Sequence, residues 1–236
     1  MDSKDNLLEV RNLTVRFGRL TALDGVSYDL RRGETLGIVG ESGSGKTTSA
    51  RVVCGLQKAT SGSFELAGRV AMIFQDPLGS LNPRQTIRAA LVEVLRHAQK
   101  RGVETPGLGE LLEQVELDES CLDKYPHEFS GGQRQRICIA KALALAPDLL
   151  ICDEAVSALD LSVRATVLDL LAELKRKLSL TMLFITHDLG VVSHIADRVL
   201  VMSRGRIIEE GPCGQVLKAP REEYTKRLIA SVLRLT

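Results

Sequence analysis

A glycine-rich segment near the N-terminus carries residue types that bind phosphate. It follows the pattern G-x-x-x-x-G-K-S/T and comprises Gly40, Glu41, Ser42, Gly43, Ser44, Gly45, Lys46 and Thr47, with Thr48 next. Glycines let backbone amides turn inward around phosphate oxygens, and the N-terminus of the following helix adds partial positive charge. We expect Lys46 to reach the β- and γ-phosphates of a nucleotide, and the Thr47 hydroxyl to bind Mg²⁺.

Two carboxylates follow a short apolar run much later in the chain. The run Leu149–Cys152 leads directly into Asp153 and Glu154. Ligands of open α/β sheets bind at the carboxyl ends of the strands, which is where these side chains would lie. Asp153 suits the outer shell of magnesium, where it would hold a magnesium-bound water, and Glu154 suits a general base acting on the attacking water. Together with the phosphate loop, they predict hydrolysis of a nucleoside triphosphate.

A third motif offers a second phosphate-binding surface. The residues Ser130, Gly131, Gly132 and Gln133 precede an apolar helix expected over 137–145. Ser130 can cap that helix, and the glycines expose backbone amides at its positive end. The motif on its own also fits a well-capped helix with a flexible entry. A motor that closes its site with two subunits would use such a surface.

The remaining pattern indicates an α/β sheet covered by helices. Short apolar runs typical of buried parallel strands occupy residues 35–39, 69–74, 149–152, 181–185 and 198–202. Helices are expected over 46–56 and 163–178, the second from its period near 3.6 residues. Alternation over 7–17 and 26–30 suits a small antiparallel sheet. We expect a single domain, 1–236, with a helical insertion at about 77–146.

The order and spacing of these motifs resemble the ATP-binding cassette (ABC) family over nearly the whole chain. The resemblance implies a P-loop NTPase (RecA-like) core, a small N-terminal antiparallel β subdomain and an inserted α-helical subdomain. It implies that ATP and Mg²⁺ are bound, and that Ser130–Gln133 contacts the γ-phosphate of ATP held by the opposite subunit.

The resemblance also extends to single residues. Phe17 falls at the aromatic position that stacks on adenine, where the family more often has tyrosine. Gln75 matches the glutamine that senses magnesium and the attacking water. Asp160 closes the segment 157–160, which is similar to the loop that communicates across the dimer. His187 is similar to the switch histidine that contacts the γ-phosphate.

Three segments, 75–84, 125–133 and 219–225, resemble the dipeptide, oligopeptide and nickel importer branch. This implies a second ATPase subunit, identical or different, arranged head to tail, together with transmembrane permease subunits. The chain would then sit peripherally on the cytoplasmic face of the membrane. Peptide, nickel chelate, glutathione and opine all remain open as cargo. Many branch members have a cysteine-containing tail, so we expect a tail-less subunit or one half of a longer protein.

Composition narrows the alternatives. The net charge of +1 gives no excess of positive charge of the kind that broad nucleic-acid binding requires. No apolar run approaches the roughly 20 residues of a membrane-spanning helix. Five scattered cysteines favour a reducing compartment over a disulfide or zinc framework. A non-transport ABC-type ATPase, as in translation or DNA repair, remains the alternative. A small-molecule P-loop kinase is disfavoured because it has no use for S-G-G-Q.

A loop after Gln75 suggests where a membrane partner binds. Residues 76–84 contain Pro77, Pro83 and Gly79, which favour an ordered but adjustable loop over a helix. Such a loop can move with phosphate binding and release. We expect a groove around Leu78, Leu81 and the following helix that accepts a short helix of the permease.

Overall fold

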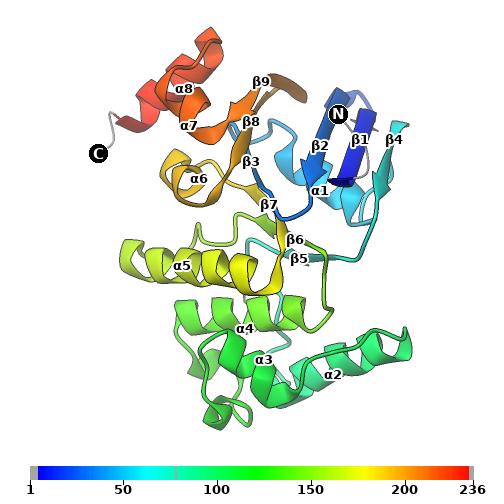
Figure 1. The fold of residues 1–236 in the computed structure, drawn as a ribbon, viewed down its shortest axis with the longest axis vertical. Helices are drawn as coiled ribbons and strands as arrows, with labels where there is room; N and C mark the ends of the chain where they lie inside the picture. The colour runs from blue at the N-terminus through cyan, green and yellow to red at the C-terminus, as the bar shows by residue number, and fades with distance from the viewer. Residues whose placement is uncertain (1–4, 78, 234–236) are drawn as a thin grey trace.

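The chain folds around two β-sheets, seen in a computed structural model that describes residues 5–77 and 79–233 (Figure 1). The smaller sheet is antiparallel, with strand order β2-β1-β4. Its strands are β1 (Asn6–Phe17), β2 (Leu20–Arg31) and β4 (Ser61–Leu66). The antiparallel sheet predicted from alternating apolar residues is therefore confirmed, and β4 extends it along the other edge of β1.

The larger sheet has the order β5-β6-β7-β3-β8-β9. It contains β3 (Thr35–Val39), β5 (Val70–Ile73), β6 (Leu149–Asp153), β7 (Thr181–Ile185), β8 (Arg198–Ser203) and β9 (Arg206–Pro212). Pairs from β5 to β8 are parallel, and β9 joins the edge antiparallel to β8. Every residue of β3, β6 and β7 is buried, which explains why these strands read as continuous apolar runs.

Alternate side chains of the central strands enter two different hydrophobic cores. On β6, Leu149 and Ile151 face the core shared with the antiparallel sheet and α1 (Lys46–Val53). Leu150 and Cys152 face the opposite core, which includes α5 (Leu161–Leu178). This two-sided burial matches the expected P-loop NTPase fold with helices covering a mostly parallel sheet.

The stretch between β5 and β6 is helical, as its periodicity predicts. It contains α2 (Ile87–Lys100), α3 (Leu108–Gln114), α4 (Gly131–Leu143) and short 3₁₀ turns at Glu119–Cys121 and Pro126–Glu128. Figure 1 shows α4 lying between α5 and the α2–α3 pair. One continuous hydrophobic core joins these helices to the central sheet.

Three further helices, α6 (Leu189–Ile195), α7 (Cys213–Lys218) and α8 (Glu223–Leu233), follow the later strands. The α8 entry is fixed by Glu209, whose carboxylate accepts hydrogen bonds from the amides of Arg221 (2.8 Å) and Glu222 (3.2 Å). Across residues 5–77 and 79–233, no helix combines the length and apolarity needed to cross a membrane.

Candidate nucleotide-binding site

The phosphate loop runs from the end of β3 to the start of α1, and two of its glycines are required by close packing. Gly40 has φ 151°, and a β-carbon there would lie 2.2 Å from the carbonyl oxygen of Met202. Gly45 has φ 106°, and its β-carbon would lie 2.5 Å from the carbonyl oxygen of Ala22. Only glycine fits both positions.

Lys46 folds back over this loop. Its side chain is only 5% exposed, and Nζ donates to the carbonyl oxygens of Gly40 (2.8 Å) and Glu41 (2.9 Å). Burial lowers the pKa of Lys46, although the carboxylates of Glu154 and Asp153 oppose that shift. The ammonium is thus a partly desolvated cation at the loop, and it would exchange backbone carbonyls for phosphate oxygens when a nucleotide binds.

Thr47 and Asp153 meet between α1 and β6. The Thr47 hydroxyl donates to Oδ1 of Asp153 at 2.9 Å. Asp153 is 5% exposed, and burial raises its pKa while the Thr47 hydrogen bond opposes the rise. A buried carboxylate beside a hydroxyl is a pair of hard oxygen donors with little solvent around it. This pair fits a small divalent cation such as Mg²⁺.

The three predicted catalytic residues lie together. Gln75 Nε2 donates to Oε2 of Glu154 at 3.1 Å, and His187 Nδ1 lies 3.4 Å from Oε1 of the same carboxylate. Glu154 adopts a left-handed backbone (φ 50°), and its amide donates to the Ile185 carbonyl on β7 at 2.8 Å. A non-glycine residue in this conformation is strained by order 1–3 kcal/mol, a feature that clusters at functional sites.

These groups open into a cleft of about 650 Å³. Such a volume suits a small organic ligand. From the predicted site, the cleft is lined by Phe17, Glu41, Ser42, Gly43, Gly45, Lys46, Thr47, Thr48, Gln75, Glu154 and His187. Phe17 is 47% exposed at the end of β1, so part of its side chain is open to a ligand in the cleft. Leu20, Thr21 and Ala22 also line the cleft, and the sequence analysis missed them although they follow Phe17 closely.

The S-G-G-Q motif lies elsewhere. Ser130 caps α4 by accepting from the Gln133 amide (3.3 Å), while the Gln133 side chain accepts from the Ser130 amide (3.0 Å). Gly132 is buried against α5, and Ser130, Gly131 and Gln133 are exposed. Asp160 caps α5, accepting from the Val163 amide at 3.0 Å. Neither this motif nor Asp160 lines the cleft, so the fold presents two separate surfaces.

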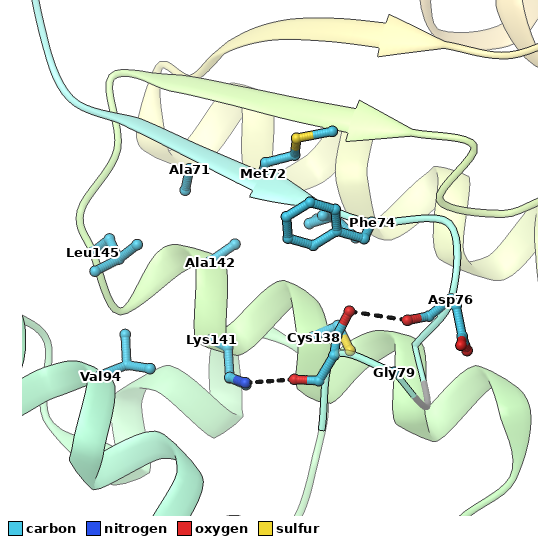
Figure 2. A pocket seen from close by; sticks show the side chains of 12 residues that line it. Ala71, Met72, Phe74, Asp76, Gly79, Val94, Cys138, Lys141, Ala142 and Leu145 are labelled. Atoms are coloured by element: carbon cyan, nitrogen blue, oxygen red, sulfur yellow. Dashed lines mark hydrogen bonds between the residues drawn. The ribbon is translucent and has the colours of Figure 1, made fainter. Parts of the chain in front are cut away.

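Beside the cleft, β5, α2 and α4 enclose an apolar groove of about 500 Å³ (Figure 2). Met72, Phe74, Val94 and Leu145 line it, together with Cys138 and Lys141. Lys141 Nζ holds the neighbouring loop by donating to the Ser80 carbonyl at 2.7 Å.

The expectation that Leu81 lines a docking groove is wrong. Leu81 is 2% exposed and packs into the core with Ile87 and Leu91. The loop turns this apolar side chain inward, and the groove is lined by β5, α2 and α4 with Asp76, Gly79 and Ser80 from the loop. Leu78, the other residue of that prediction, lies outside the described residues.

Comparison with known proteins identifies the family. Residues 23–157, more than half of the chain, match the family described as ABC transporter. The chain belongs to the ABC transporter family. It is 44% identical to the oligopeptide transport ATP-binding protein OppF of Salmonella typhimurium, over 98% of this chain and 79% of that protein. It is 45% identical to OppF of Escherichia coli, over 96% of this chain and 77% of that protein.

Solved structures agree with this assignment. CbiO1 from Clostridium perfringens, part of the ABC transporter complex cbiONQ, has a TM-score of 0.80 at 26% identity, covering 98% of this chain and 97% of that one. The ATP-binding cassette MJ0796, solved as a dimer bound to ADP and Pi, has a TM-score of 0.74 at 26% identity, covering 87% of this chain and 98% of that one. This member of the ABC transporter family therefore binds and hydrolyses ATP.

Proposed function

We propose that this ABC subunit drives an importer of peptides or related small solutes, such as a nickel chelate or glutathione. Both relatives described above are named as oligopeptide transport ATP-binding proteins. The chain would lie on the cytoplasmic face of the membrane, held there by permease subunits. The observation that carries the motor role is the grouping of Gln75 and His187 around the Glu154 carboxylate beside the phosphate loop.

The working site is a composite of two subunits. In one chain the cleft and the Ser130–Gln133 surface are separate, so each surface is free for a second cassette. A head-to-tail pair, of identical or different subunits, would cover the nucleotide in each cleft with the α4 N-terminus of the other chain. Backbone amides at a helix N-terminus favour an anion such as the γ-phosphate. Asp160, at the start of α5, would lie on the same contact surface.

Mg²⁺ fits the oxygen pair of Thr47 and Asp153, with Gln75 nearby in the cleft. When bound, the cation neutralises charge that develops on the β- and γ-phosphate oxygens. Lys46 would add its ammonium to the same phosphates, and Phe17 would stack on the adenine ring. These contacts hold the nucleotide in one position relative to Glu154.

Glu154 acts on the attacking water. Its carboxylate accepts the proton as the water oxygen attacks the γ-phosphorus, and the bond to the leaving β-phosphate oxygen breaks. Gln75 and His187, which contact the two carboxylate oxygens in this structure, orient that carboxylate and border the γ-phosphate position. In the absence of the second subunit, the Ser130–Gln133 amides are missing from the site, so turnover is slow.

The groove between β5, α2 and α4 is the proposed docking surface for a short permease helix. Its lining is mainly apolar, and it begins at Phe74, the residue before Gln75. A helix lying there would contact the chain immediately beside a residue that touches Glu154. This arrangement links occupancy of the catalytic cleft to the membrane subunits.

The substitution Glu154→Gln tests the motor role. We expect ATP binding to remain while hydrolysis falls roughly 10²–10⁴-fold, the usual contribution of a general base. With slow hydrolysis, ATP should drive dimerisation of this variant with itself or, better, with its natural partner, measured by sedimentation. The matched control is Glu173→Gln, which removes a partly exposed carboxylate on α5 that pairs with Lys177.

Unchanged turnover in folded Glu154→Gln would remove Glu154 from the role of base. A monomer at high ATP, with the natural partner present, would contradict the composite site. The cargo is tested separately, by uptake of a labelled peptide into vesicles containing the assembled importer. Uptake with the wild-type chain and none with Glu154→Gln is expected. ATP-dependent uptake of other solutes but not peptides would overturn the peptide assignment.

A further inference from the structure

Asp188 follows His187 directly, and both of its carboxylate oxygens are committed to hydrogen bonds. Oδ1 accepts from the amides of Gly190 (2.9 Å) and Val191 (3.3 Å), which caps α6. Oδ2 accepts from Arg164 Nη1 at 2.6 Å. The Asp188 amide also donates to the Thr186 hydroxyl at 3.0 Å. These bonds fix the backbone on both sides of His187.

Arg164 joins this turn to a second loop. It lies in the first turn of α5, and its side chain is 23% exposed. Besides its bond to Asp188, Nη2 donates to the Leu159 carbonyl at 3.2 Å, and the Arg164 amide donates to the Asp160 carbonyl at 2.8 Å. One guanidinium therefore contacts both the end of the 157–160 segment and the turn that carries His187. A lysine ammonium lacks the planar fork needed to hold both acceptors in this geometry.

We propose that Arg164 is a positioning residue that couples the 157–160 segment to His187. This inference rests on the proposed two-subunit site, because the change begins when the 157–160 segment contacts the second subunit. The His187 ring is 62% exposed and lies 3.4 Å from Glu154. Its position therefore depends strongly on the backbone beside it. A shift of Leu159 on subunit contact is passed through Arg164 and Asp188 to His187, and so to the Glu154 carboxylate.

The coupling predicts a specific kinetic signature. Arg164→Ala leaves the phosphate loop untouched, so KM for ATP should stay near the wild-type value. We expect kcat of the assembled transporter to fall about tenfold, which equals ~1.4 kcal/mol of activation free energy. Asp188→Asn retains an oxygen for the α6 cap but loses the charge that pairs with Arg164. It should lower kcat similarly, and the double variant should lose little more, because both changes break one link.

A matched control exists on the same helix. Lys175, near the other end of α5, pairs with Asp197 at 2.6 Å, with its side chain 21% exposed. Lys175→Ala therefore removes an ion pair of equal length whose cation is similarly buried and which lies away from the His187 turn. We expect it to leave kcat unchanged. Arg164→Lys, which restores charge without the fork, should recover only part of the lost turnover.

The outcomes separate this inference from the proposed function. A wild-type kcat in Arg164→Ala and Asp188→Asn, with Glu154→Gln inactive, would overturn the coupling and leave the motor role standing. Equal losses of kcat in Arg164→Ala and Lys175→Ala would show a general effect of α5 stability and would also overturn it. Active Glu154→Gln would instead contradict the proposed site itself. If Arg164→Ala does not fold, Asp188→Asn against Lys175→Ala decides the question.

Discussion

Gly132 of α4 packs against Val163 of α5, and replacing it should change stability with opposite sign depending on the residue at 163. A β-carbon at Gly132 would lie 2.4 Å from Cγ1 of Val163, far inside van der Waals contact. Valine has one strongly preferred side-chain rotamer in a helix, so Val163 cannot easily turn away. Overpacking of this kind costs about 1–3 kcal/mol. Alanine in place of glycine gains at most about 1 kcal/mol of helix propensity, so Gly132→Ala should destabilise the chain by up to about 2 kcal/mol.

The same substitution should become neutral or stabilising once Val163 is shortened. In a Val163→Ala background the clashing methyl group is gone, and only the helix-propensity gain of up to about 1 kcal/mol remains. Urea unfolding of the wild type, both single variants and the double variant gives the coupling energy, expected within the range of about 0.5–3 kcal/mol for residues in contact. If Gly132→Ala changed stability equally in both backgrounds, close packing against Val163 would not be the reason for glycine there.

Two further predictions concern the groove and the C-terminal helix. Val94→Glu puts a charge into the apolar groove, so it should abolish the stimulation of ATPase activity by the assembled permease while leaving basal ATPase activity unchanged. Val92→Glu lies on the same helix but outside that groove, so stimulation should be preserved. If both variants lost stimulation, a loss of α2 stability would be the cause instead. Burial tends to raise the pKa of Glu209, but hydrogen bonds from the Arg221 and Glu222 amides and from Thr225, together with the Arg221 charge, outweigh it and hold the pKa below the ordinary 4.5. Its stabilising contribution is therefore full above pH 4.5 and is lost as pH falls through the lower folded pKa. The protection factors of the α8 amides, which are exchange rates corrected for the intrinsic effect of pH, should fall there, and Glu209→Gln should show low protection already at neutral pH. Protection of α8 that does not change with pH in the wild type would contradict this.

The central strands could be predicted because each is buried on both faces. Strands β3, β6 and β7 have no solvent-facing side and therefore appear as unbroken apolar runs. Strands β4 and β9 lie at sheet edges and have many exposed or partly exposed residues. Their sequences therefore show neither a continuous apolar run nor an apolar–polar alternation that would predict a strand. Their positions depend on backbone hydrogen bonds to β1 and β8, which are long-range contacts that local sequence does not encode.

The candidate site divides in the same way. Residue types and spacing could predict Lys46 and Glu154, and the family resemblance added Gln75 and His187; all four follow a strand or begin a helix. The inward turn of Leu81 could not be predicted, because it depends on the space left between α2 and the central sheet. From sequence alone, an apolar residue in a Pro- and Gly-containing loop is consistent with two roles: a surface residue that contacts a partner, or a buried residue that packs in the core.

In the isolated chain, the reactive groups are hydrogen-bonded to one another. The Lys46 ammonium is held by two carbonyls, Thr47 by Asp153, and Glu154 by Gln75 with His187 beside it. A nucleotide would replace the carbonyls at Lys46 with phosphate oxygens, exchanging one set of charge-assisted hydrogen bonds for another. Binding therefore needs no large rearrangement of the phosphate loop. In the proposed composite site, hydrolysis also requires the Ser130–Gln133 surface of a second subunit, because within one chain that surface lies outside the cleft. We expect nucleotide affinity to be set within one chain and turnover by contact between two.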